Sequence, residues 1–472
     1  MATQKAYDVI IVGAGPAGIF AALELAQHPE LKTLILEKGP SLDKRRCPSR
    51  ISMVNCVRCR TCAQLNGWGG AGAFSDGKLT LSTEVGGRLG EYLTQERLRE
   101  LTSEVDQIYL DHGATPVLHG KGDVQALVNE ASMAGLRLIP TPIRHLGTDE
   151  CDKILSHIYD SLRPKIDIRF NSSVTDIEKH NGQLWDVSTA KGQSFTAPNV
   201  VLAPGRDGHE WLTKATKRLG LTFKNNPVDI GVRVEADAAV LEKYTRELYE
   251  AKIEHFTPTF DDRVRTFCMC PNGEVTMEMC DGEDPVITVN GHSNRLSKTG
   301  NTNFALLVST NFTEPFHEPI AYGKYVARLA NMISGGVLVQ RLGDLLAGRR
   351  STPSRMTKST VRPTLKSAVP GDLSYVLPHR HLIDILETLE ALEKIIPGIN
   401  SRSTLLYGIE VKFYSARLEL DKSLQTRLPG LYAIGDGAGI TRGLVQASAS
   451  GLVAARAILA KASPRASGAP AL

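Results

Sequence analysis

The chain has 472 residues, of which 42% are hydrophobic, so it is long enough for two or three domains with their own cores. Its 55 Lys and Arg residues nearly balance 51 Asp and Glu residues, and a net charge of +4 does not indicate a nucleic-acid-binding protein. Glycines and a proline interrupt the longest early apolar stretch. We therefore expect no membrane span, no signal peptide and a cytoplasmic location.

The first predicted element is a strand over residues 7–12, followed by glycines spaced G-x-G-x-x-G and then a helical pattern. Gly13 permits a tight turn, Gly15 lets the backbone approach a pyrophosphate, and Gly18 lets helix and strand pack closely. A second predicted strand ends at Glu37, which can accept hydrogen bonds from an adenosine ribose, while the helix N-terminus faces the phosphates. The predicted contacts of this dinucleotide-binding unit are Gly13, Gly15, Pro16, Ala17, Gly18, Glu37 and Lys38.

Four of the eight cysteines follow within sixteen residues, the last three spaced C-x-x-C-x-x-C, among six basic residues. The spacing favours a four-thiolate iron–sulfur or zinc site, because clustered cysteines in the reducing cytosol seldom form disulfides. The neighbouring cations favour a thiol redox relay instead, and free cysteine is also often packed in a core. The sequence leaves these three interpretations open for Cys47, Cys56, Cys59 and Cys62.

A second G-x-G-x-x-G runs from Gly67 to Gly72, but no strand precedes it and no clear helix follows it. We interpret this loop as a segment whose backbone lies against the ring system of the bound cofactor, where larger side chains would collide with the rings. Its predicted contacts are Gly72, Ser75 and Lys78. No other nucleotide-binding pattern stands out between Gly205 and Gly435. Electrons would then come from transiently bound NAD(P)H or from another donor, such as a ferredoxin-like protein.

The middle of the chain predicts two further regions. Helical patterns over residues 84–147 indicate an insertion, and strands followed by helices over 216–404 indicate an α+β substrate domain. Cys268 and Cys270 alternate along one predicted strand, so both would point to one face, either into a core or toward the cofactor. His292 follows a strand in a polar turn and is a candidate general acid or base, or a solvated loop histidine.

Two later segments resemble the two-dinucleotide-binding-domain flavoproteins of the glutathione-reductase type. One is a strand-rich run ending in Ala203-Pro-Gly205, and the other is a strand leading into Gly435-Asp436 and a small-residue helix. The resemblance implies that the cofactor is FAD, that Asp436 contacts its ribityl and pyrophosphate, and that the late helix aims its N-terminus at the flavin pyrimidine. The contacts it implies are Val174, Ala203, Gly205, Gly435, Asp436, Gly443, Leu444 and Val445.

The motif G-A-G-x-F-S-D-G-K-L over residues 70–79 narrows the resemblance. Together with TFCMCPNGEV, VNGHSN and GDGAGITRGLVQASASG, it is similar to a family of bacterial FAD-dependent dehydrogenases, and the similarity spans most of the chain. That family is defined by its sequence more than by its reaction, so the resemblance implies no particular substrate.

We therefore expect an α/β fold in which a Rossmann-like FAD-binding domain is assembled from residues 1–83, 148–215 and 405–462, followed by a disordered tail over 463–472. The expected function is that of an FAD-dependent oxidoreductase. It would transfer hydride between an organic small molecule and flavin N5. If the four cysteines bind an iron–sulfur cluster, that cluster would be a further electron carrier. The alternatives are a flavin monooxygenase, an RNA-modifying flavoprotein and a cysteine-based flavin redox sensor.

Overall fold

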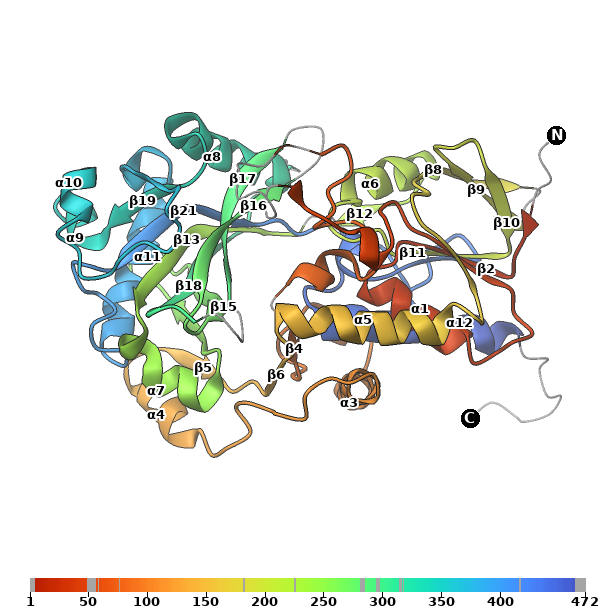
Figure 1. Ribbon diagram of the computed structural model, residues 1–472, viewed down its shortest axis with the longest axis horizontal. Helices are drawn as coiled ribbons and strands as arrows, with labels where there is room; N and C mark the ends of the chain where they lie inside the picture. The colour runs from red at the N-terminus through yellow and green to blue at the C-terminus, as the bar shows by residue number, and fades with distance from the viewer. Residues whose placement is uncertain are drawn as a thin grey trace.

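The protein is described here from a computed structural model, and two units lie side by side in it (Figure 1). The structure describes residues 5–48, 57, 59–75, 77–180, 183–224, 226–280, 285–293, 298–313, 316, 318–415 and 417–462. Cys56, Asp76 and the predicted tail over 463–472 lie outside these ranges.

The first unit is built on a five-stranded parallel sheet with the order β23-β11-β2-β3-β7. Every residue of β2 and β3 is buried, as expected for parallel strands covered on both faces. The strands are β2 (Val9–Val12), β3 (Thr33–Leu36), β7 (Asp167–Arg169), β11 (Asn199–Leu202) and β23 (Leu431–Ala433). This sheet confirms the predicted Rossmann-like FAD domain of an α/β protein.

Helix α1 (Pro16–Leu25) begins with a proline at its first position, where no N–H is needed, and buries most of its residues. It packs closely against α12 (Leu444–Ala462), because a Cβ at Gly451 would lie only 2.2 Å from the Ala17 carbonyl oxygen. The remaining helices of this unit are α3 (Gln95–Asp111), α5 (Thr148–Leu162) and α6 (His209–Arg218), with 3-10 turns η1 (Leu42–Lys44), η2 (Gly70–Phe74), η3 (Leu89–Glu91) and η5 (Asp436–Ala438).

Smaller sheets complete the first unit. A four-stranded sheet has the order β1-β10-β9-β8, and two further pairs are β4-β6 and β12-β22. Their strands are β1 (Lys5–Ala6), β4 (Lys78–Thr80), β6 (Ile143–His145), β8 (Val174–His180), β9 (Leu184–Thr189), β10 (Ser194–Ala197), β12 (Phe223–Lys224) and β22 (Arg417–Leu418).

The second unit is built on an eight-stranded sheet with the order β20-β19-β21-β13-β18-β15-β14-β5, in which every pair except β19/β20 is antiparallel. A hairpin of β16 and β17 lies beside it. The strands are β5 (Arg137–Ile139), β13 (Val228–Asp237), β14 (Lys252–Phe256), β15 (Arg263–Cys270), β16 (Glu274–Cys280), β17 (Val286–His292), β18 (Asn301–Thr310), β19 (Leu338–Arg341), β20 (Val369–Pro370) and β21 (Leu405–Lys412).

Helices pack on this sheet, and its buried core is distinct from that of the first unit. They are α4 (Gln125–Met133), α7 (Ala238–Leu248), α8 (Pro319–Ser334), α9 (Leu342–Leu345), α10 (Pro353–Met356), α11 (His379–Glu393) and the 3-10 turn η4 (Leu373–Tyr375). Among the described residues, each helix falls short of the length or the apolar character that crossing a membrane requires.

Two of the expected boundaries are wrong. The segment 84–147 is not a single helical insertion, because α3 joins the first core whereas α4 and β5 join the second. The FAD-binding unit does not resume at residue 405, because β21 pairs with β13 and β19 in the second sheet. Every residue of β21 is buried, including the charged Glu410 and Lys412, so the alternation of apolar and charged residues in its sequence does not mark an exposed face.

Candidate functional site

The glycine loop after β2 has the geometry of a tight phosphate-binding turn. Gly13 has a φ of 106°, and a Cβ there would lie 2.2 Å from the Ala203 carbonyl oxygen. A Cβ at Gly18 would lie 2.1 Å from the carbonyl oxygen of Gly13. Gly13 therefore excludes a side chain because of its positive φ and the nearby Ala203 carbonyl. Gly18 excludes one because the helix packs closely against the loop.

Gly15 differs from its two partners because a Cβ there would meet no protein atom within 4 Å. It is the N-cap of α1 and has no side chain to accept hydrogen bonds from the helix's first backbone N–H groups. An open space in front of an uncapped helix N-terminus suits a phosphate group. This part of the chain therefore fits the pyrophosphate of a dinucleotide.

The Glu37 carboxylate is buried at the end of β3 and bonded to three backbone amides. Its Oε2 accepts from Ala14 at 2.7 Å, and its Oε1 accepts from Gly39 at 2.7 Å and from Gly67 at 2.8 Å. Glu37 thus fastens the glycine loop to the loop that carries the second glycine motif. One lone pair of Oε2 is left by these bonds and could accept from a ribose hydroxyl.

The second glycine motif forms η2, and it lies directly against the first one. The Gly69 amide donates to the Ala14 carbonyl at 2.8 Å, and a Cβ at Gly70 would lie 3.0 Å from the Gly15 Cα. A Cβ at Gly72 would lie 2.8 Å from the Leu444 side chain, at the start of α12. The loop is therefore wedged between the N-termini of α1 and α12, where only glycine permits such close approach.

The remaining predicted contacts of the first unit meet at the same place. The Thr441 hydroxyl donates to Asp436 Oδ1 at 2.6 Å, and Arg206 Nε lies 3.6 Å from Asp436 Oδ2. A Cβ at Gly435 would lie 2.9 Å from the Ala17 Cβ. The Lys38 ammonium lies 3.0 Å from Asp207, close in the chain to Ala203 and Gly205 after β11. Val174 is buried at the start of β8, in the smaller four-stranded sheet.

A pocket opens where this region meets the second unit. Its walls are Arg206, Asp436, Gly439, Thr441 and Arg442 of the first unit and Phe267, Lys412, Phe413, Tyr414 and Ser415 beside the second sheet. Gly443, Leu444 and the buried Val445 follow Arg442 directly into α12. The pocket therefore adjoins both the Asp436 loop and the antiparallel sheet.

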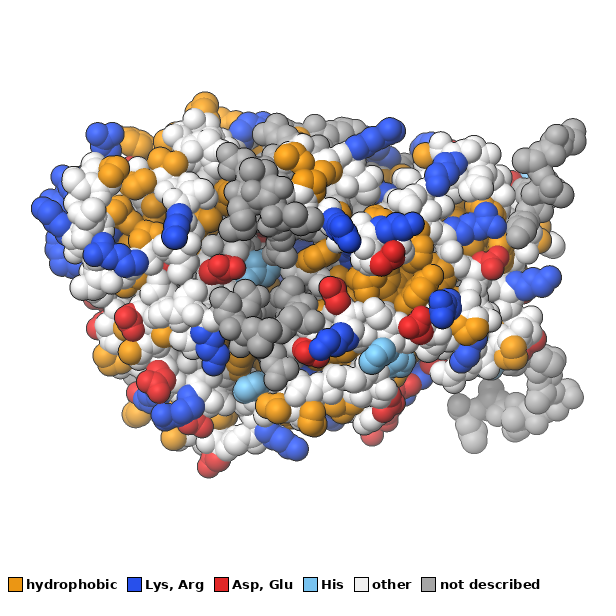
Figure 2. Space-filling view, in the orientation of Figure 1, with side chains coloured by type: hydrophobic (Ala, Val, Ile, Leu, Met, Phe, Trp, Pro, Cys, Tyr) orange, Lys and Arg blue, Asp and Glu red, His pale blue; other side chains and the backbone are white. Residues whose placement is uncertain are grey.

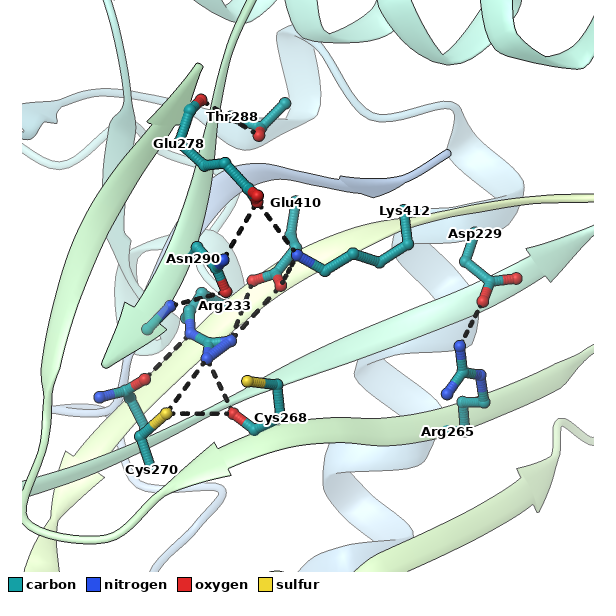
Figure 3. A network of polar contacts seen from close by, with 12 residues as sticks. Asp229, Arg233, Arg265, Cys268, Cys270, Glu278, Thr288, Asn290, Glu410 and Lys412 are labelled. Carbon is teal, nitrogen blue, oxygen red and sulfur yellow. Dashed lines mark hydrogen bonds and ion pairs between the residues drawn. The ribbon is translucent and has the colours of Figure 1, made fainter. Parts of the chain in front are cut away.

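A buried network of charges supports the second wall of the pocket (Figure 3). Arg233 and Glu410 are both 0% exposed, and they are 3.3 Å apart. Lys412 Nζ lies 3.0 Å from Glu410 and 3.5 Å from Glu278. Burial alone would lower the pKa of Lys412, but the two carboxylates raise it above its usual value. Lys412 is therefore held as a cation at the pocket wall.

Comparison with known families matches each unit separately. Residues 7–208 match the family described as pyridine nucleotide-disulphide oxidoreductase. Residues 227–413 match the family described as FAD-dependent protein, C-terminal domain-like, and residues 365–466 match glucose inhibited division protein A. The first of these matches contains the glycine loop, and its description agrees with the phosphate-binding geometry of that loop. The chain is an FAD-dependent oxidoreductase.

Individual relatives of this oxidoreductase are distant. An uncharacterized protein of Clostridium beijerinckii is 28% identical over 483 residues, covering 96% of this chain and 80% of the relative. L-amino acid deaminase from Proteus vulgaris is 13% identical with a TM-score of 0.41, covering 98% and 95% of the two chains. Glycine oxidase from Geobacillus kaustophilus is 14% identical with a TM-score of 0.39, covering 97% and 95%. Similarity at this level identifies no substrate.

In this flavoenzyme, Lys78 reaches away from the glycine loops and into the second unit. Its ammonium donates to the Met269 carbonyl, lies 3.5 Å from Glu250 and lies 4.0 Å from the Cys268 sulfur. It also lies 5.8 Å from the centre of the Tyr249 ring. Lys78 was expected to contact the cofactor, and the structure places it as a bridge between the two units.

The predicted alternation of Cys268 and Cys270 is wrong. The pairing of β15 with β18 shifts between Phe267 and Cys270, and Cys268 has a φ of 46° inside this bulge. Cys270 is consequently buried with its sulfur 3.7 Å from Arg233, whereas Cys268 is partly exposed beside Lys78. A bulge adds one residue to a strand and so breaks the period of two.

The remaining predicted residues are less closely grouped. His292 is the half-buried last residue of β17 rather than part of a turn. Burial raises the pKa of the nearby Glu278 carboxyl, but Lys412, Arg206 and, to a smaller extent, His292 lower it below its usual value. Among the described residues no group of three or more His, Cys, Asp or Glu could hold a metal ion. Cys47 accepts from Gln64 at 3.0 Å, and Cys59 is exposed.

Because Cys56 lies outside the described residues, the four-ligand interpretation stays a prediction. One neighbouring cation already has a structural role. Arg45 is buried and donates to the carbonyls of Ala63, Gln64 and Trp68, which holds the loop that enters η2.

Sequence reasoning missed Tyr249 and Glu250. Tyr249 has a φ of 63°, which is unusual for a bulky residue, and its hydroxyl bonds to His145 at 3.0 Å and to Ser293 at 2.9 Å. Both residues lie at the end of α7, far from Lys78 in the sequence, and no motif marks them. Only the three-dimensional fold brings them to the boundary between the units.

Proposed function

We propose that this flavoenzyme catalyses hydride transfer between a small organic molecule and N5 of FAD, as a dehydrogenation or a double-bond reduction. The residues proposed to hold FAD are those of the glycine loop, Glu37, the η2 loop, Asp436 and the start of α12. Bound FAD would supply the hydride acceptor or donor, and the second unit would supply the substrate-binding surface.

The observation that carries this proposal is the position of the pocket. It lies between the Asp436 loop of the dinucleotide-binding unit and the aromatic and basic side chains of the second unit. A substrate held there would have its organic part against Phe267, Phe413 and Tyr414, beside the charged side chains of the pocket. Such contacts would hold a small molecule in position for transfer of hydride to or from bound FAD.

Hydride transfer also requires a proton to leave or reach the substrate, and two side chains are proposed for this role. His292 is half-buried and within electrostatic reach of Glu278, which also interacts with the pocket residues Lys412 and Arg206. Cys268 is partly exposed beside the Lys78 ammonium, and a neighbouring cation favours the thiolate form of a cysteine. We propose His292 as the general base or acid, with Cys268 as the second candidate.

The experiment is anaerobic mixing of the FAD-loaded protein with a panel of alcohols, amines, hydroxy acids, amino acids and conjugated enones. Loss of the visible flavin band, with conversion of the compound established by mass spectrometry, is the expected result. His292→Gln should slow this reduction by about 100-fold or more with the same flavin content. Failure of every compound to reduce the flavin, with an oxygenated product formed when the dithionite-reduced protein is mixed with the compound and then with oxygen, would identify a monooxygenase instead.

We further infer that the chain belongs to the bacterial FAD-dependent dehydrogenases with the motif G-A-G-x-F-S-D-G-K-L. The match of residues 227–413 to an FAD-dependent C-terminal domain supports this inference. An RNA-modifying alternative would use the exposed basic side chains of the loop over residues 349–362, which gather at the outer end of the second unit, over α9 and α10, away from the boundary between the units (Figure 2).

A further inference from the structure

The walls of the pocket carry more positive than negative charge. Arg206, Lys412 and Arg442 are the basic residues that line it, and Asp436 is the acidic one. Two of the three cations have acidic partners. Lys412 lies 3.0 Å from Glu410, and Arg206 lies 3.6 Å from Asp436. The third, Arg442, requires a separate explanation.

Arg442 makes no ion pair and no side-chain hydrogen bond among the described residues. Its guanidinium carbon lies 3.5 Å from the centre of the Tyr414 ring. Within the described part of the chain, this cation–π contact is the interaction that holds the guanidinium. Burial lowers the pKa of this guanidinium below its usual value. A largely buried cation without an acidic partner is unfavourable unless a ligand supplies the anion.

The carboxylate that acts electrostatically on Arg442 is that of Asp229, and it is already paired with another arginine. Arg265 and Tyr414 both donate to the same oxygen of Asp229, and Arg265 also donates to the Tyr414 hydroxyl at 2.7 Å. Asp229 is therefore neutralised by Arg265, and it fixes the tyrosine ring on which Arg442 lies. Stacking on that ring holds the guanidinium plane and leaves its N–H groups available at the edge, where a carboxylate can accept two hydrogen bonds.

We propose that Arg442 binds the carboxylate of the substrate, so that the substrate of this flavoenzyme is a small organic acid. The position of Arg442 favours this ligand, because its guanidinium stacks on Tyr414 beside the second sheet rather than on the glycine loops that fit the pyrophosphate. Phe267 and Phe413 would then contact the organic part of the acid. This inference rests on the proposed hydride transfer in the same pocket.

The experiment uses benzoate and propionate as probes, with benzamide and propionamide as uncharged controls of similar shape. Binding to the FAD-loaded protein is measured both by calorimetry and by the change in the visible flavin spectrum. We expect the carboxylates to bind and the amides to bind at least about tenfold more weakly. Arg442→Met should weaken carboxylate binding by about tenfold or more with flavin content retained, and Arg427→Met, a change at an exposed arginine, should not.

Three results would overturn the proposal. One is carboxylate affinity in Arg442→Met equal to that of the unaltered protein, and another is the absence of carboxylate binding altogether. The third is loss of FAD from Arg442→Met with benzoate affinity unchanged, which would assign the guanidinium to the cofactor. If Arg442→Met does not fold, Arg442→Lys keeps the charge but not the planar fork, and must itself weaken benzoate binding. Failure of the proposed hydride transfer is a different result: it would be seen in the reduction experiment, as a flavin that no organic compound reduces.

Discussion

Gly15 is the residue whose substitution separates cofactor binding from folding most clearly. A Cβ there meets no protein atom within 4 Å, so Gly15→Val should be accommodated by the fold. The added side chain would occupy the space in front of the α1 N-terminus, where the phosphates are expected. We predict that FAD affinity falls by at least about 100-fold, or roughly 3 kcal/mol, whereas the melting temperature of the FAD-free protein is unchanged. Titration of apoprotein with FAD and thermal unfolding measure the two effects.

Gly18→Val is the matched control, since its Cβ would lie 2.1 Å from the Gly13 carbonyl oxygen. It should lower the melting temperature of the FAD-free protein. Flavin-replete, yellow Gly15→Val protein would contradict the assignment of this glycine to the pyrophosphate.

Single substitutions of the cysteines at residues 47–62 distinguish a metal centre from a redox pair. If a metal centre is bound, loss of one ligand should release all of the metal, so Cys56→Ala and Cys59→Ala should have equal, non-additive effects on metal content. Metal and sulfide analysis of anaerobically purified protein measures this. If the cysteines are a redox pair, thiol titration should change on oxidation with no metal present. Iron, zinc and sulfide all far below one equivalent would exclude the ligand interpretation.

For single residues, the sequence predicts contacts between neighbours in the chain, but it does not predict contacts with residues that are distant in the chain. The glycines of the first loop and the acidic end of β3 are set by a short continuous stretch, so their turn and their proximity follow from spacing. Lys78 also lies in a recognisable motif, yet its ammonium is held by Glu250 and the Met269 carbonyl. Those partners come from a different unit, and nothing near Lys78 in the sequence indicates them.

Strands β13 and β21 depend on the buried carboxylate of Glu410. This side chain is 0% exposed and lies between Arg233 and Lys412. Glu410→Gln would leave Arg233 without an acidic partner in the core and would weaken the pairing of Lys412. We predict a loss of about 3–5 kcal/mol in the free energy of unfolding, measured by urea denaturation.

The exposed pair of Glu419 with Lys224 provides a control of the same chemistry, and Glu419→Gln should lower the stability far less than Glu410→Gln does. Equal losses in the two variants would show that the β13–β21 network contributes little to stability.

The connection between α7 and β14 should make the protein sensitive to acid. Burial opposes ionisation of Glu250, but Lys252 and Lys78 lower the pKa of its carboxyl to about 2, from 4.5. A carboxyl with a lowered folded-state pKa stabilises the protein above its unfolded pKa, and this stability is lost as the pH falls through the folded pKa. Between about pH 5 and about pH 3 we expect Glu250 to account for a loss of roughly 2 kcal/mol.

Glu250→Gln should therefore be less stable near neutral pH but show a shallower decline over the same acid range. Urea denaturation at several pH values measures both slopes. Parallel pH profiles for the two proteins would rule out this contribution.

Elements were predicted best where their pattern is periodic. The first strands and helix follow from an apolar run, a glycine turn and a helical period in direct succession. Strand β15 was predicted as a strand, but the bulge at Cys268 was not, because a bulge leaves the composition of the strand unchanged. Strand β21 was assigned to the wrong sheet because its uniformly buried residues suit either one.

The architecture of the whole molecule followed from the order of its motifs, whereas the interface between the units did not. Residues 84–147 cross from one core to the other, and this crossing places β4 and β6 beside Tyr249. Such an arrangement depends on packing between segments that are remote in sequence.

The arrangement of the two units leads to a prediction about the electron donor. Within the described part of the chain, a G-x-G-x-x-G turn that joins a parallel strand to a helix N-terminus occurs once, at β2 and α1, and the η2 glycines pack against it instead of opening a second such unit. The second unit is a largely antiparallel sheet without a phosphate-binding turn of that kind in its described residues. We therefore predict that NADH and NADPH bind weakly and reduce the flavin slowly compared with the organic substrate. Anaerobic stopped-flow measurement of flavin reduction at increasing nucleotide concentration tests this, with the organic substrate as the reference. Saturation at micromolar nucleotide with rapid reduction would mean that the boundary between the units contains a nicotinamide site.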